Sequence, residues 1–249
     1  IGDFRFSVGV NGGHATNKID FWDEIPGAPD WHKSTGASFG SNGVNYLAYE
    51  YDGVFIDQAD IDKNTLDYSG LVGTLRPGDM KYKDIDGNKI INQDDRTRLK
   101  KNRDRMFTGG ASINLQYKDF DRSILFQGAT GGLLYFGTES GSIGNYLEYS
   151  YKNRWSIENP SSVHPRSANR GDQYYSGLNT YWLKNSDYLR LKNVELGYNL
   201  SAKLTEKVGI NNCRVYINAL NLLTFDKMKI YDPGATSSRG QYYPQARII

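Results

Sequence analysis

The segment Phe107–Lys118 constrains the fold more than any other part of the chain, because its residues alternate strictly in polarity. One set of positions carries Phe107, Gly109, Ala111, Ile113, Leu115 and Tyr117, and the other carries Thr108, Gly110, Ser112, Asn114, Gln116 and Lys118. Successive side chains of a β-strand point to opposite faces, so the pattern predicts a strand with one apolar and one polar face. The 12 residues are enough to cross a bilayer as a tilted strand. The apolar face is therefore expected against lipid or in a core.

Other segments have patterns typical of strands, and the connections between them differ in length. The strands are predicted at residues 4–17, 107–118, 122–128, 188–200, 213–223 and from 244 onward. Asn45–Ile56 has a weaker strand pattern, and Asp119-Phe120-Asp121 is predicted to form a short turn. The connections run long, short, long, short, long. This alternation is typical of outer-membrane β-barrels, which have short periplasmic turns and long external loops.

Within residues 188–200 the alternation changes phase once. Leu189 and Leu191 fall on one face, whereas Val194, Leu196 and Tyr198 fall on the other in simple alternation. A β-bulge near Lys192-Asn193 is predicted, because one extra residue would bring both sets of apolar side chains to the same face.

Composition narrows the class of protein. The 249 residues carry a net charge of +2, which gives no reason to expect nucleic acid as a partner. The mean hydropathy is −0.63 and no apolar run has the length of a membrane helix, which argues against a helical membrane protein. Spanning strands alternate in polarity and stay compatible with these values. The single cysteine excludes an intrachain disulfide and a cysteine-based zinc site.

The segment Asp84–Asp95 follows the ligand order of a twelve-residue calcium loop. With Asp84 as position 1, the oxygen donors at positions 1, 3, 5, 7, 9 and 12 are those of Asp84, Asp86, Asn88, the Ile90 carbonyl, Asn92 and Asp95. Lys89 replaces the usual glycine of position 6, and Asp95 is one methylene shorter than the usual glutamate. The segment therefore predicts a possible calcium ion. The alternative is a solvated turn rich in Asp and Asn that holds no metal.

Sequence motifs give no support for an enzyme. No G-x-S-x-G motif is present, and Gly128–Gly132 does not lead into a helix, so neither a nucleophile elbow nor a phosphate-binding loop is expected. No catalytic residues are predicted. Aromatic side chains in the long connection after residue 128 are predicted to stack on sugars or to contact a partner protein; the alternative is that they serve the packing of the loops on one another. They are Trp155, Tyr174, Tyr175, Tyr181 and Trp182.

Several motifs in fixed order resemble the C-terminal part of SusC/RagA-like TonB-dependent outer-membrane transporters of Bacteroidetes. The most specific are YLRLKNVELGY within Tyr188–Leu200 and NRWSIENP at Asn153–Pro160. The others lie at Pro77–Thr97, Met106–Gly128, Arg214–Phe225, Tyr231–Gly234 and Tyr242–Arg247. Together they cover most of residues 44–249.

The resemblance implies an all-β fold: a segment of an antiparallel transmembrane barrel of about 22 strands with long extracellular loops. Residues 1–249 would be the C-terminal portion of that barrel, with the plug domain and the TonB box outside this chain. The implied function is TonB-dependent import of an oligosaccharide or oligopeptide at the outer membrane. The implied partners are a SusD-like surface lipoprotein, the TonB-ExbB-ExbD system through the missing N-terminal part, outer-membrane lipid and the glycan or peptide substrate.

A secreted, soluble β-sandwich that binds glycans and is stabilised by calcium is the alternative. The two interpretations differ in the environment of the apolar face that carries Phe107, Ile113, Leu115 and Tyr117. A barrel places this face against lipid, whereas a sandwich buries it in a core. The chain begins inside a predicted strand and has neither a methionine nor a signal peptide there, so we expect it to be a piece of a longer protein.

Overall fold

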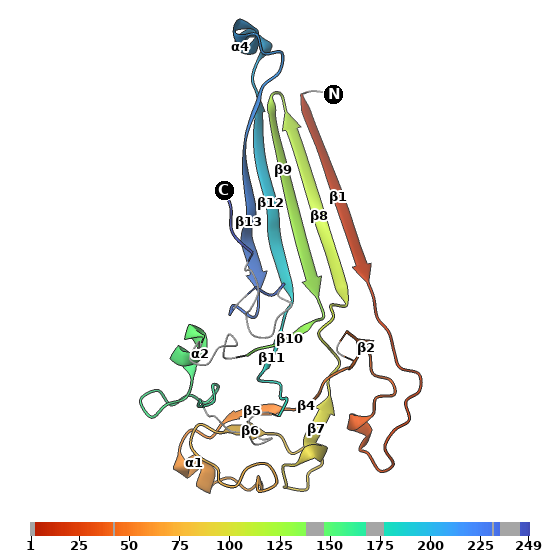
Figure 1. Cartoon of the computed structure of the whole chain (residues 1–249), viewed down its shortest axis with the longest axis vertical. Coiled ribbons are helices and arrows are strands. Elements are labelled where there is room, and N and C mark those ends of the chain that lie inside the picture. Colours follow the sequence, from red (N-terminus) through yellow and green to blue (C-terminus); the bar gives the residue numbers. More distant parts are fainter. Residues whose placement is uncertain (1–2, 42, 138–146, 168–176, 231, 235–244) are drawn as a thin grey trace.

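A five-stranded antiparallel sheet forms one half of the molecule, as the computed structural model shows (Figure 1). The structure describes residues 3–41, 43–137, 147–167, 177–230, 232–234 and 245–249. The strand order is β1-β8-β9-β12-β13. Their bounds are Phe4–His14, Phe107–Tyr117, Phe120–Thr130, Tyr188–Asn199 and Arg214–Asp226. The predicted strands are therefore found, with β1 ending earlier and β13 running further than expected. The predicted strand from residue 244 is reduced to a bridge between Ile248 and Leu220, and residue 244 itself lies outside the described residues.

The connections sort by length to the two ends of the sheet, as the sequence predicts. The long connections from β1 to β8 and from β9 to β12 leave at one end, while the shorter ones lie at the other (Figure 1). Only Lys118 and Asp119 join β8 to β9. Lys118 has a φ of 53°, in the left-handed region that a two-residue hairpin requires. The prediction of a turn at Asp119-Phe120-Asp121 is therefore wrong, since Phe120 and Asp121 already belong to β9.

The predicted β-bulge in β12 is confirmed. Its pairing with both neighbouring strands shifts register between Leu191 and Asn193. As a result Leu191 lies opposite Phe126, and Val194 lies opposite Ile124. Those two β9 residues share a face, so the bulge brings both halves of β12 onto the apolar face of the sheet.

The long connections fold into a compact base at one end of the sheet. It contains four two-stranded sheets, formed by β2 (Phe39–Gly40) with β3 (Gly43–Val44), β4 (Leu47–Tyr49) with β7 (Arg96–Arg98), β5 (Tyr51–Val54) with β6 (Met80–Tyr82), and β10 (Leu133–Tyr135) with β11 (Leu183–Asn185). Short helices are α1 (Gln58–Asp62), α2 (Glu148–Asn153), η1 (Asp30–His32) and η2 (Gln93–Asp95). At the opposite end α4 (Ala202–Thr205) and η3 (Glu206–Val208) connect β12 to β13.

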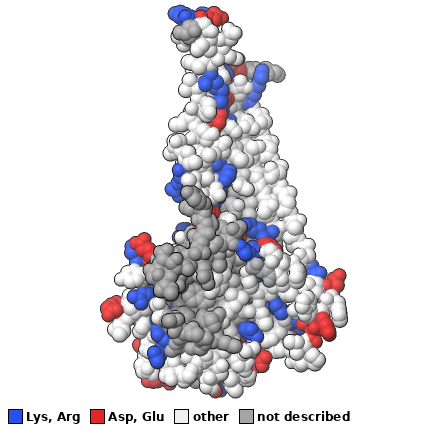
Figure 2. All heavy atoms as spheres, in the orientation of Figure 1, with Lys and Arg blue, Asp and Glu red and all other residues white. Residues whose placement is uncertain are grey.

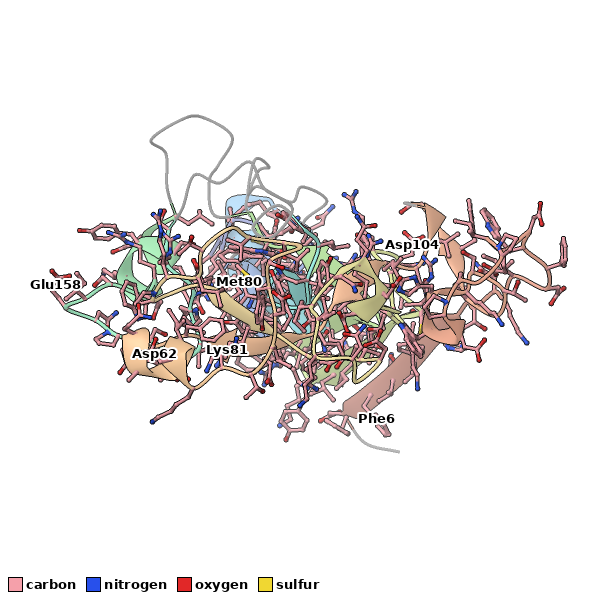
Figure 3. All side chains as sticks on the ribbon, turned by 90° about the horizontal axis from the view of Figure 1, so that it is seen from below. Phe6, Asp62, Met80, Lys81, Asp104 and Glu158 are labelled. Carbon is pink, nitrogen blue, oxygen red and sulfur yellow. The ribbon has the colours of Figure 1, made fainter. Side chains whose placement is uncertain are left out.

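The hydrophobic core lies in this base, and among the residues that the structure describes the large sheet has no comparable core. Its buried residues are Tyr49, Phe55, Tyr68, Leu71, Val72, Met80, Tyr82, Ile91, Phe136, Tyr181 and Trp182. Seen from below, Met80 lies in the middle of the base, whereas Phe6 lies at the outside with its side chain pointing away from it (Figure 3). The predicted strand Asn45–Ile56 is split here into β4 and β5, which pair with different strands. The prediction of one continuous strand is therefore wrong. None of the helices in the described part of the chain is long and apolar enough to cross a membrane.

Candidate functional site

The two faces of the five-stranded sheet differ sharply in chemistry, and the strand register aligns that difference across all five strands. One row joins Phe4, Tyr117, Phe120, Tyr198 and Val215, and a second joins Val8, Ile113, Ile124, Val194 and Ala219. Side chains of this apolar face remain open to solvent, with 67% of Phe6 and 79% of Val10 exposed. Aromatic residues gather in the row nearest the short turn, where the rings of Phe120 and Tyr198 lie 4.6 Å apart. The sheet therefore presents a broad, uncovered apolar surface.

The opposite face carries polar side chains that bond to one another across strands. Ser123 Oγ donates to Asn114 Oδ1 at 2.9 Å, and Asn114 Nδ2 donates to Ser7 Oγ at 3.3 Å. Arg214 pairs with both Asp121 and Glu195, the latter at 2.6 Å. Charged side chains gather mainly at the base and near α4, with few over β1 and β8 (Figure 2). This polar face is suited to water, and the apolar face is not.

The acidic segment Asp84–Asp95 lies in the base, between β6 and β7. Asp84, Asp86 and Asp95 each offer a carboxylate oxygen, and these three oxygens lie within 4.8 Å of one another. Calcium–oxygen bonds of about 2.3–2.6 Å allow one ion to reach three oxygens at such separations. The three carboxylates predicted from the sequence therefore converge, and hard anionic oxygens are the donors that calcium prefers.

The other three predicted ligands have defined places in the same loop. Asn88 Oδ1 accepts the Ile90 amide at 2.6 Å, and Asn92 Oδ1 accepts the Asp94 amide at 2.6 Å. Ile90 forms a parallel bridge with Asp67, and the next residue, Ile91, is fully buried in the core. Lys89, at the position where calcium loops usually have glycine, adopts a φ of 67°. The backbone therefore makes the left-handed turn that glycine normally provides, despite the Lys89 side chain.

Backbone amides hold the carboxylates of this loop in place. Asp95 is fully buried, and its two oxygens accept the amides of Ile85 and Asn92, each at 2.8 Å. Asp84 accepts the amides of Gly87 and Lys89. Desolvation raises the pKa of Asp84, but the hydrogen bonds from Lys89 and Gly87 outweigh it and hold that pKa below its ordinary value. The backbone contacts therefore favour the charged form of the Asp84 carboxylate.

The loop aromatics predicted for sugar or partner contact mostly pack within the base. Tyr181 and Trp182 belong to the buried core, with their rings 4.7 Å apart. Trp155 Nε1 donates to the Ile56 carbonyl, and the Trp155 ring lies against Gly78. For these three residues the structure therefore agrees with packing of the loops on one another. Tyr174 and Tyr175 lie outside the described residues.

A buried ion pair ties the segment after β13 to the sheet, and nothing in the sequence analysis predicted it. Arg190 Nη2 lies 2.7 Å and 2.9 Å from the two Asp232 oxygens, and Arg190 Nε donates to Thr224 Oγ1 at 3.1 Å. The Arg190 and Asp232 side chains are only 5% and 10% exposed. The Tyr188 ring has the guanidinium groups of Arg105 and Arg190 within 5.5 Å and 5.1 Å of its centre. This cluster closes the base end of the sheet on its polar face.

Comparisons with known proteins show sequence similarity over most of the chain, including both the sheet and the base. TonB-dependent receptor P3 of Formosa agariphila is 30% identical over 243 residues, which is 94% of this chain. The chain belongs to the TonB-dependent receptor family. A second receptor of that bacterium, P26, is 30% identical over 174 residues, or 68% of the chain. The chain spans 23% and 17% of the lengths of these two relatives. No family model matches it.

Solved structures of similar fold agree with this family assignment. The RagAB peptide transporter superposes with a TM-score of 0.65 at 21% identity, over 98% of this chain and 26% of that one. The RagAB peptide importer in its closed-closed state gives 0.62 at 23% identity, with the same coverage. The predicted resemblance to SusC/RagA-like TonB-dependent receptors is confirmed. The relatives are named as receptors or transporters, consistent with the expectation that this receptor segment is not an enzyme.

Proposed function

We propose that this chain forms part of the wall and the external loops of an outer-membrane barrel that imports nutrients by a TonB-dependent mechanism. The uncovered apolar face of the five-stranded sheet is the observation that carries the proposal. Its strands are 11–13 residues long, which matches the span of tilted membrane strands. In the barrel the apolar face would contact lipid, the polar face would line the lumen, and the base would lie outside the cell.

The proposed import involves partners and substrate beyond this chain. A SusD-like surface lipoprotein would close over the base, and the TonB-ExbB-ExbD system would act through the N-terminal plug. The fold shared with RagAB supports the lipoprotein partnership, and its description as a peptide importer supports an oligopeptide as one substrate class. An oligosaccharide is the other. The motifs shared with SusC-like sequences support localisation of the protein in the outer membrane of a member of the Bacteroidetes.

The competing function is that of a soluble, glycan-binding β-sandwich. The exposure of the apolar face of the sheet disfavours it. A sandwich buries the inner face of each sheet against a second sheet about 10 Å away. Here the apolar side chains of β1 and β13 stay exposed, including 57% of Val8 and 58% of Ile217. A face of this size left in water would be an aggregation hazard.

Placing a charge on the apolar face tests the proposal. Ile113→Arg lies midway along β8 on that face, and it is expected to lower the free energy of unfolding by about 2–4 kcal/mol. Asn114→Arg, one residue on, is the matched control; its charge faces the lumen, and the loss is expected below about 1 kcal/mol. Urea titration of the full-length receptor in lipid vesicles, read by heat-modifiable gel mobility, measures both. Equal losses in the two variants, or a receptor recovered without detergent, would contradict the proposal.

Calcium binding at the acidic loop stays a prediction, and thermal unfolding can test it. A bound ion would join the Asp84, Asp86 and Asp95 oxygens and rigidify the base. We expect calcium to raise the thermal midpoint of the wild-type receptor relative to EDTA-treated protein, and Asp84→Ala to abolish that rise. Magnesium is the control, because it favours near-ideal octahedral sites that keep several waters. Identical midpoints with calcium and with EDTA in the wild type would refute the site.

A further inference from the structure

Arg122 is the exception on the apolar face of the sheet. It lies in β9, and its row otherwise contains Phe6, Leu115, Leu196 and Ile217. Within the paired rows of this face it is the only Lys, Arg, Asp or Glu. Its side chain is exposed. A charge on a lipid-facing surface is costly near the bilayer centre and tolerated near the interface, so its depth along the strand matters.

The register places Arg122 just inside the aromatic row at the short-turn end. Phe120 belongs to that row, and Arg122 follows it two residues later. That spacing corresponds to about 7 Å along a strand, and to less along the membrane normal when the strand is tilted. Aromatic rows mark the level of the lipid headgroups in membrane barrels. An arginine at this depth can extend its guanidinium back to that level while its methylenes stay in the apolar layer.

In the described ranges Arg122 has no carboxylate partner. The adjacent acid, Asp121, lies on the polar face and pairs with Arg214. Among the described residues no ion pair involves Arg122. Lys118 in the hairpin is a second cation beside the aromatic row, because its Nζ lies 5.5 Å from the centre of the Tyr117 ring, which belongs to that row. The aromatic row thus has a cation on each side along the strands: Lys118 at the turn, and Arg122 in the next row away from the turn.

We propose that Arg122 and Lys118 bind the phosphate of a phospholipid headgroup in the leaflet at the short-turn end. The lipid's acyl chains would lie on Leu115, Leu196 and Ile113, below the guanidinium. Arginine suits this role because its planar group donates two parallel hydrogen bonds to phosphate oxygens. The inference rests on the proposed function, since it needs the apolar face in the membrane.

Lipid binding to the purified full-length receptor tests the inference. Native mass spectrometry would follow titration with phosphatidylglycerol, with diacylglycerol of the same chains, and with inorganic phosphate. Arg122→Gln is expected to weaken phosphatidylglycerol binding about tenfold, the loss of one good charge-assisted contact. Arg122→Lys should retain part of the affinity. Arg5→Gln is the matched control, because Arg5 is also exposed but lies on the polar face, and it should bind like the wild type.

The inference would be overturned by equal binding by wild type and Arg122→Gln, by equal loss in Arg5→Gln, or by undiminished binding of diacylglycerol. Binding of inorganic phosphate alone would also overturn it, since the site would then take a free anion. Heat-modifiable mobility checks that each variant is folded. If the receptor is soluble without detergent, the proposed function is wrong. If the receptor requires detergent but the Arg122→Gln variant still binds its lipid, only this inference is wrong.

Discussion

Replacing Arg190 with methionine is expected to release the segment that follows β13 from the sheet. The methionine keeps much of the side-chain volume but removes the guanidinium that contacts both Asp232 oxygens. Removing one partner of a buried ion pair costs about 3–5 kcal/mol, because the other charge stays in a poorly solvated site. Native-state hydrogen exchange of the full-length receptor should show this loss as faster exchange of amides in residues 224–230 and 232–234, with little change in β1 or β8.

A double variant separates the ion pair from simple packing. Arg190→Met combined with Asp232→Leu removes both charges, so it should recover part of the lost protection, because an apolar pair is often as stable as a buried ionic one. Arg5→Met, on the exposed part of β1, controls for the loss of an arginine as such. If the double variant is less stable than Arg190→Met alone, the ion pair is not what anchors the segment.

The sequence predicted the large sheet well because its pattern is local. Strict alternation over Phe107–Lys118 gives both the strand and the side each residue faces, and one phase slip in β12 was enough to place the bulge. The hairpin turn was misplaced because Lys118 adopts a left-handed φ, which is uncommon for a non-glycine residue and has no sequence signal. The alternation of polar and apolar residues was therefore enough to predict the strands, whereas the exact position of the turn depended on the backbone conformation of Lys118.

The base could not be predicted in the same way. Its core joins residues far apart in the chain, such as Phe55, Ile91 and Trp182, and no periodicity links them. Asn45–Ile56 has the composition of one strand, but tertiary pairing divides it between partners. Likewise the Arg190–Asp232 pair spans 42 positions, and a sequence without aligned relatives gives no signal for it. In contrast, the acidic loop is contiguous in the chain. The spacing of its residues alone was therefore enough to predict that its three carboxylates lie close together.

Replacing Asp95 with alanine is expected to loosen the acidic loop even in calcium-free buffer. The Asp95 carboxylate is fully buried and accepts the amides of Ile85 and Asn92, so alanine would leave both donors unsatisfied. Each unsatisfied donor costs about 1–3 kcal/mol, so the two together predict a local loss of about 2–6 kcal/mol. Exchange of the Ile85, Ile91 and Asn92 amides, measured with EDTA present, reports it directly.

Asp86→Ala is the matched control, because it removes a carboxylate of the same cluster from an exposed position. Asp86 is exposed and accepts the amide and the side chain of Asn88 within its own turn, so its loss should change calcium-free stability by less than about 0.5 kcal/mol. With calcium added neither variant should gain stability, since both lack an oxygen that the ion needs. A calcium response that survives in Asp86→Ala but not in Asp95→Ala would show that Asp95 orders the loop while Asp86 takes no part in holding the ion.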